Sequence, residues 1–242
     1  MKVTIFGMNL SLLGIIENSN SVPDYPGWEL KTFSVNNFSK FGSKAVTLMT
    51  PEPTHGFYVD EGLEKFITTY GYKDKMGREA RMNFGGVHKF AVPQKSTGLK
   101  LVLEGYDALK DKIYDTDGYL GLIDGKENIA ASWSFAGLLE HWNRKHAQAC
   151  YIPSMKRKTD DEIYKQQYSY GNLVIMGVKT DFSLFLKQVA LGNIYYDPGI
   201  KLEFAIPGVR DRGTKRRSQF RMKASQLTNL YKENEVVNLV SI

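Results

Sequence analysis

The sequence contains a single cysteine, Cys150, among its 242 residues. One thiol excludes an internal disulfide and a cysteine-based zinc cluster, and it is typical of a reducing cytoplasm, where we expect the protein. The four histidines are scattered. His141 and His146 lie five residues apart on a predicted helix, so they diverge rather than share a metal ion. His55 and His88 fall in predicted loops, where we expect solvated side chains.

Long apolar runs are absent as well. No stretch of about 18 apolar residues occurs, so no membrane span is expected. The apolar N-terminus is interrupted by Asn9 and Ser11 and lacks a small-residue cleavage site, which predicts a folded segment rather than a signal peptide. Gly85-Gly86 lacks the lysine that follows in a phosphate-binding loop, and no G-x-S-x-G motif indicates a serine nucleophile.

The composition predicts one globular domain spanning residues 1–242, because 42% of the residues are hydrophobic. Strands are predicted at 28–31 and 45–50, as neighbours in one sheet. Helices are predicted at 61–71, in the segment 131–146 with Ser134 as the cap, and at 182–192. The segment 156–165 is predicted to be a solvated connection. Further strands are predicted at 83–92, 99–106, 119–124, 149–155, 173–178, 200–206 and 219–223. This mixed order predicts an α/β or α+β fold with a mixed sheet.

The formal charge of +6 is concentrated near the C-terminus, which favours a polyanionic partner. The residues between 210 and 223 include one acid, Asp211, and seven cations: Arg210, Arg212, Lys215, Arg216, Arg217, Arg221 and Lys223. Gln219 lies among them. The cations alternate with Ser218, Gln219 and Phe220, a pattern that resembles a strand facing a DNA groove. Arginines in such a strand pair with guanine edges and hold phosphates. A solvated loop is the alternative interpretation.

The segment V-P-D-Y-P-G-W-E-L-K, residues 22–31, combines two acids and a lysine. Its prolines and Gly27 predict a bend that brings Asp24 towards Glu29. Side chains alternate along a strand, so Glu29 and Lys31 are predicted on one face, with Trp28 and Leu30 towards the core.

Two carboxylates beside an ammonium group suit Mg²⁺ and a phosphodiester. The alternative is a surface turn that enters a strand with solvated charges. Together with the basic stretch, the first interpretation makes DNA cleavage the simplest joint explanation.

Several blocks in order resemble the MvaI/BcnI family of monomeric type II restriction endonucleases, relatives of the mismatch-repair nicking enzyme MutH. In this sequence, V-P-D-Y-P-G-W-E-L-K-T resembles the metal-site block of the family. The run T-L-M-T-P-E-P-T at 47–54 resembles the strand and turn that follow that block in the family. The helix and strand at 132–152 and the late R-R-S-Q-F-R-M match further family blocks. The resemblance covers nearly the whole chain.

The resemblance implies that Asp24 and Glu29 bind Mg²⁺ and that Lys31 serves the attacking water. It implies a PD-(D/E)xK nuclease core within a two-lobed clamp, with catalytic and recognition lobes around double-stranded DNA. Such enzymes act as monomers that cut one strand at a time, and a cognate DNA methyltransferase protects the host.

Two departures leave alternatives open. Family members carry a further segment at the front and a helix glutamate that supports the metal site. Leu10 or Ser11 stands in place of that glutamate here, and the nearest acid is Glu17. The alternatives are a MutH-like nicking enzyme that needs a partner and a non-enzymatic DNA-binding protein.

Overall fold

The computed structural model describes residues 27–160, 166–204 and 216–239. These residues form two compact units. The first comprises the described residues up to Val46, Trp142–Leu184 and the described residues from Met222 onward; the second comprises Thr47–His141 and Phe185–Arg221. The assignment of a catalytic and a recognition lobe within one domain stays a prediction.

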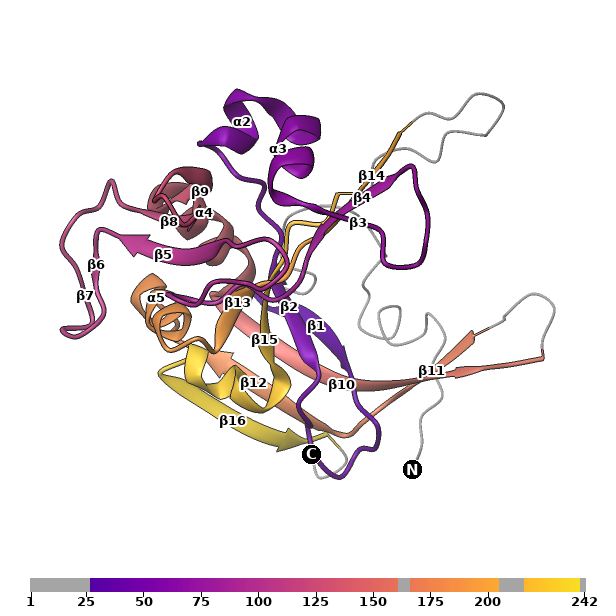
Figure 1. The fold of residues 1–242 in the computed structure, drawn as a ribbon. Helices are drawn as coiled ribbons and strands as arrows, with labels where there is room; N and C mark the ends of the chain where they lie inside the picture. Colours follow the sequence, from indigo (N-terminus) through magenta and orange to yellow (C-terminus); the bar gives the residue numbers. More distant parts are fainter. Residues whose placement is uncertain (1–26, 161–165, 205–215, 240–242) are drawn as a thin grey trace. The chain divides into compact units, whose positions relative to one another are not determined.

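The first unit is built on a mixed sheet in the order β1-β10-β12-β16, shown in Figure 1. Its strands are β1 (Glu29–Ser34), β10 (Gln148–Lys158), β11 (Gln166–Tyr170), β12 (Leu173–Val178) and β16 (Glu233–Asn238). β1 is parallel to β10, with Glu29 opposite Ala149. The other pairs, including β11 with β10, are antiparallel. The predicted mixed sheet is therefore confirmed.

The core of the first unit lies against this sheet. The 3₁₀ helix η1 (Ala224–Leu230) and the last turn of α4 (Phe135–His146) contribute to it. A Cβ atom at Gly177 on β12 would overlap the Tyr231 ring, so this glycine allows the ring to lie directly on the strand. Fully or nearly fully buried side chains of this core include Phe33, Trp142, Ala149, Tyr151, Val174, Ile175, Leu230 and Tyr231.

The second unit contains small antiparallel sheets and short helices. One sheet has the order β5-β8-β9 and another β14-β4-β3, and β6 pairs with β7. The third, β13-β15-β2, belongs to this unit except for the terminal residues of β2 and β15. The strands are β2 (Ala45–Met49), β3 (Tyr72–Lys73), β4 (Arg81–Gly85), β5 (Lys100–Glu104), β6 (Tyr106–Asp107), β7 (Lys112–Ile113), β8 (Tyr119–Ile123), β9 (Ile129–Ser134), β13 (Ile194–Tyr196), β14 (Gly199–Glu203) and β15 (Phe220–Lys223). The helices are α2 (Phe57–Asp60), α3 (Gly62–Tyr70) and α5 (Phe182–Ala190), whose first residues belong to the first unit.

An aromatic cluster forms the centre of the second unit. The Trp133 ring centroid lies 4.9 Å from that of Tyr196 and 5.1 Å from that of Phe220, in edge-on geometry. Trp133 Nε1 donates a hydrogen bond of 3.0 Å to the carbonyl oxygen of Pro51, so the indole is buried with its polar group satisfied.

Most predicted elements are present, with two corrections. β1 and β2 are not neighbours: β1 pairs with β10, whereas β2 lies beside β15. Residues 131–134 of the predicted helical segment belong to β9 instead, whereas the predicted cap is confirmed: α4 begins directly after Ser134, whose Oγ accepts a hydrogen bond of 3.2 Å from the Gly137 N–H.

His88 also differs from expectation, because it is completely buried rather than solvated. It stacks on Phe84, its Nε2 lies 2.8 Å from Thr97 Oγ1, and burial lowers its pKa to about 4. None of the helices in the described part of the chain has the length and apolar character needed to cross a lipid bilayer.

Candidate active site

Strand β1 places Glu29 and Lys31 on the same face, as the alternation predicts. Gly27 supplies the turn before the strand, with a φ of +79° that favours glycine. Glu29 is only 6% exposed, and Phe33 continues the same face at 3%. Trp28 and Leu30 are half-buried. The expectation that Glu29 faces away from the core is therefore wrong: the acid is on the more buried face.

Burial of Glu29 is offset by two ammonium groups. Lys31 Nζ lies 3.0 Å from Glu29 Oε1, and Lys145 Nζ lies 3.2 Å from Glu29 Oε2. A buried carboxylate is costly unless it is paired, so each oxygen has the partner that its desolvation requires. Sequence reasoning missed Lys145 because it lies 116 residues from Glu29 in the chain. Only the pairing of β1 with β10, which follows α4, brings the two together.

A buried polar network fixes the end of α4 that carries Lys145. His146 stacks on Trp142 with ring centroids 4.0 Å apart and planes 9° apart. His146 Nδ1 lies 3.3 Å from both the Tyr151 and Tyr231 hydroxyl oxygens, which are 2.9 Å from each other. The prediction that His146 and His141 do not form a metal pair agrees with this internal role.

The tyrosines in this network are neutral groups in a dry environment. Burial raises the pKa of Tyr151 well above its usual value, with further contributions from Tyr231 and from the charge of Glu29. Burial likewise raises the pKa of Tyr231. Cys150, next to Tyr151, is a half-buried free thiol whose pKa is raised by burial to about 11, so it is a poor nucleophile.

The chemistry of the donor atoms fits a hard divalent cation in part. Glu29 provides carboxylate oxygens, the ligand type that Mg²⁺ prefers, but both oxygens are already paired with ammonium groups, which a metal ion would have to displace or share. No cluster of three or more His, Cys, Asp or Glu side chains suited to a metal ion occurs within residues 27–160, 166–204 and 216–239. Mg²⁺ is commonly held by one or two carboxylates with waters and phosphate oxygens, so Glu29 needs at most one further acid. Asp24, the predicted partner, lies outside the described residues.

The basic stretch is only partly described by the structure. Arg210, Arg212 and Lys215 lie outside the described residues, whereas Arg216 and Arg217 are exposed. Gln219 Oε1 accepts a hydrogen bond of 3.4 Å from Thr47 Oγ1. Arg221 Nη1 lies 2.7 Å from Asp197 Oδ2, so this guanidinium stabilises the second unit internally. The DNA contacts predicted for these residues stay predictions.

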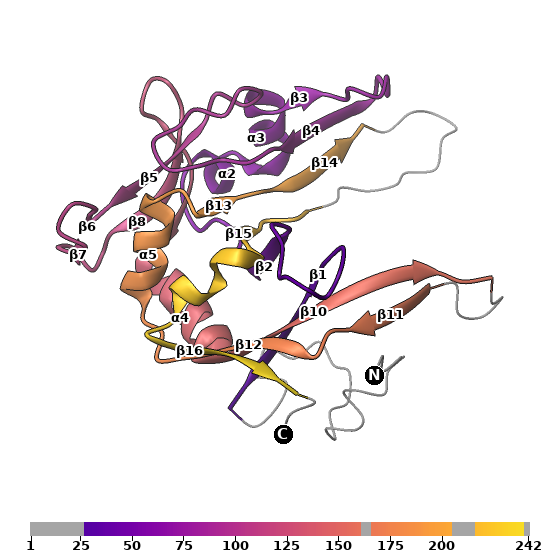
Figure 2. The ribbon, with the colours of Figure 1, turned by 90° about the horizontal axis from the view of Figure 1, so that it is seen from below.

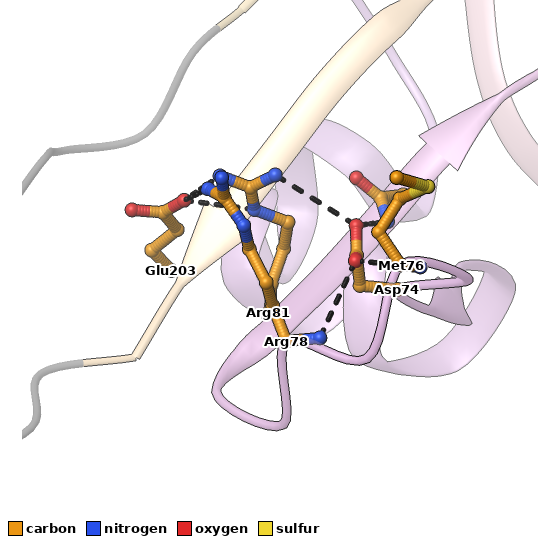
Figure 3. Close-up of polar contacts among 6 residues, drawn as sticks. Asp74, Met76, Arg78, Arg81 and Glu203 are labelled. Atoms are coloured by element: carbon orange, nitrogen blue, oxygen red, sulfur yellow. Dashed lines mark hydrogen bonds and ion pairs between the residues drawn. The ribbon is translucent and has the colours of Figure 1, made fainter.

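An ion-pair network links β4 to β14, the strand that precedes the basic stretch in the chain. Figure 3 shows Arg81 of β4 between Asp74 and Glu203. Arg81 Nε donates a hydrogen bond of 2.7 Å to Glu203 Oε1, and Arg78 Nη1 lies 3.7 Å from the same oxygen. Asp74 accepts a hydrogen bond from Asn83 and others from backbone N–H groups, which together lower its pKa. Residue 203 ends β14, so the network ties the end of this strand to β4.

The fold is that of solved restriction endonucleases. The structure of restriction endonuclease MvaI with its cognate DNA substrate matches with a TM-score of 0.62 and 18% identity, covering 91% of this chain and 82% of that chain. MvaI in the absence of DNA matches with a TM-score of 0.53 and 17% identity, covering 89% and 80%. At these identities the likeness concerns the fold, and it confirms the predicted mixed α+β class.

The model of the MvaI/BcnI restriction endonuclease family matches residues 3–231, and the chain belongs to this family. It is therefore a site-specific deoxyribonuclease by family, and DNA is its partner. No curated protein matches the sequence.

Proposed function

We propose that this protein is a Mg²⁺-dependent type II restriction endonuclease that hydrolyses phosphodiester bonds of double-stranded DNA one strand at a time. The observation that carries the proposal is the buried Glu29 carboxylate, held between Lys31 and Lys145 on a strand of the mixed sheet. Burying a carboxylate with two ammonium groups costs desolvation free energy, and an apolar residue would stabilise the strand without this cost. The arrangement therefore favours a functional role for the charge of Glu29.

In this proposal Asp24 and Glu29 hold the Mg²⁺ ion. When bound, the ion lowers the pKa of a coordinated water and offsets the charge that develops on the phosphate. Lys31 lies on the same strand face as Glu29, so it is placed to orient the attacking water as an ammonium or, in its neutral amine form, to take a proton from that water. Lys145 approaches from α4 and adds positive charge where an anionic phosphate is brought against an anionic carboxylate.

The recognition of bases is assigned to the basic stretch. Arg210, Arg212, Lys215, Arg216, Arg217 and Gln219 are proposed to contact DNA, with Arg221 supporting them through its Asp197 ion pair. We also propose that the enzyme acts as a monomer and that a cognate methyltransferase protects the host DNA, without a physical complex.

The test compares the wild-type protein with Glu29→Gln on supercoiled plasmid in MgCl₂. The amide keeps the size of the side chain but removes the charge that binds a cation, so we expect cleavage to fall below detection. Glu235→Gln, an exposed acid on β16 of the same sheet, is the matched control and should cut like the wild type. Unchanged cleavage by Glu29→Gln would refute the assigned site.

The products also separate the alternatives. Discrete linear fragments support a restriction enzyme, whereas open circles alone indicate a nicking enzyme of the MutH kind, whose rate an added partner protein would raise. Binding without cleavage at any Mg²⁺ concentration would contradict the proposed reaction. Chelation with EDTA should abolish cleavage if a divalent ion is required.

A further inference from the structure

Strand β10 continues beyond the sheet that contains the candidate active site. It pairs with β1 only as far as Ser154 and with β12 only over Gln148–Tyr151. Over Ser154–Lys158 it pairs with β11, so that residues 154–158 and 166–170 form a narrow antiparallel ribbon. Figure 2 shows this β10–β11 ribbon running away from β12 and β16 of the same unit. The sequence predicted only a solvated connection for part of this segment.

The ribbon has a cationic and aromatic face. Residues directly opposite each other across two strands share a face. Lys156 is opposite Tyr168 and Lys158 is opposite Gln166, two residues further along, so these four side chains lie on one face. The Lys156 ammonium lies 5.8 Å from the centroid of the Tyr168 ring. Lys156 and Lys158 are both exposed.

The other face is organised differently. Arg157 lies between the two lysines and therefore points to the opposite side, where its Nε donates a hydrogen bond of 2.8 Å to Gln167 Oε1. The described residues of the ribbon include three cations and no acid. In the sequence, Asp160, Asp161 and Glu162 follow the lysines. Since Arg157 is engaged by Gln167 on the other face, the exposed Lys156 and Lys158 offer an anionic partner the most accessible positive charge of the described ribbon.

The length of β10 limits how far along a bound duplex the ribbon lysines can lie from Glu29. Lys156 and Lys158 follow Ala149, the residue opposite Glu29, by seven and nine positions along β10. At about 3.3 Å per residue the two positions lie up to about 23 and 30 Å along the strand. Duplex DNA advances about 3.4 Å per base pair, so the lysines reach at most about seven to nine base pairs from the phosphate at Glu29.

We propose that the lysine face of the β10–β11 ribbon binds the phosphate backbone of the duplex that flanks the recognised bases. This inference rests on the proposed action on double-stranded DNA, and it adds a contact surface separate from the basic stretch at 210–221. Ammonium groups on an exposed strand provide charge without base-specific geometry, so the ribbon contributes affinity and register rather than sequence preference.

The experiment measures binding to a duplex of arbitrary sequence, of about 30 base pairs, by fluorescence anisotropy in EDTA across a series of salt concentrations. Each phosphate contact contributes about 0.9 to the slope of log K against log salt. We expect Lys156→Ala/Lys158→Ala to lower the magnitude of this slope by about two and to weaken binding most at low salt. The charge-retaining Lys156→Arg/Lys158→Arg should behave like the wild type, and thermal melting shows whether each variant is folded.

Arg157→Ala is the control, because it removes one positive charge from the opposite face of the same ribbon. Its slope should equal that of the wild type. An unchanged slope in the folded double alanine variant, or a loss in Arg157→Ala of about half the double variant's loss, as expected if any charge on the ribbon counts equally, would overturn the proposal. If the wild type binds no duplex, the proposed function fails. If it binds and cleaves while the ribbon variants are unchanged, only the ribbon assignment fails.

Discussion

The ion pair between Glu29 and Lys145 leads to a prediction about metal affinity. If Glu29 holds a divalent cation as proposed, the Lys145 ammonium competes with that ion for Glu29 Oε2, which lies 3.2 Å from the lysine nitrogen. Removing the lysine should therefore strengthen cation binding while it removes positive charge from the site. We expect Lys145→Met, which keeps the apolar stem of the side chain, to bind Mg²⁺ more tightly and to cleave more slowly.

The magnitude follows from the geometry. A hydrogen bond to a charged group contributes about 1.5–3 kcal/mol. The Lys145 side chain is 26% exposed, so we take the lower end of that range. About 1.5 kcal/mol corresponds to a roughly tenfold lower dissociation constant for the ion.

The assay is a MgCl₂ titration of the free protein by isothermal calorimetry, with the cleavage rate at saturating Mg²⁺ measured in parallel. Lys179→Met, an exposed lysine paired with Glu233 in the same unit, is the control and should change neither quantity. A Mg²⁺ affinity that is unchanged or weaker in Lys145→Met would refute competition for Glu29.

Two further predictions concern stability. Gly177→Ala places a methyl group against the buried Tyr231 ring, so it should lower the free energy of unfolding by about 1–3 kcal/mol. Gly125→Ala, with nothing within 4 Å of the new atom, should change it by less than about 0.5 kcal/mol in the same urea titration. An equal loss in the free energy of unfolding for the two variants would show that the Tyr231 ring moves away freely, which would contradict the predicted overlap. The lowered pKa of Asp74, caused first by the Asn83 hydrogen bond, means that its contribution is present at neutral pH and is lost as the pH falls through its folded-state value. Asp74→Asn should therefore lower the urea midpoint at pH 7 but less so at pH 2–3, and parallel losses at both pH values would contradict this assignment.

Local patterns in the sequence were sufficient to predict most helices and strands, and to predict that Glu29 and Lys31 lie together in the candidate site. The alternation in E-L-K fixes Glu29 and Lys31 on one face of β1, and the apolar spacing identifies α3 and α5. Their pairing partners were not predictable in the same way. β1 lies beside β10 rather than β2 because tertiary contacts, and not proximity in the sequence, select the neighbours of a strand.

Burial explains the remaining differences. Nothing in the residues around His88 shows that Phe84 and Thr97 enclose it. Similarly, Arg221 belongs to a cationic run in the sequence, but its guanidinium pairs with Asp197, which directly follows β13. The charge of a residue is local information, whereas its partner depends on the whole fold.

The long separation between Glu29 and its partners has a consequence during protein synthesis. Lys145 emerges from the ribosome long after Glu29, and the Tyr231 ring that supports the α4 end emerges later still. Parallel pairing of β1 with β10 cannot begin until the intervening segment has been made. A nascent chain that has not yet reached these residues therefore lacks the partners that hold Glu29 in the candidate active site.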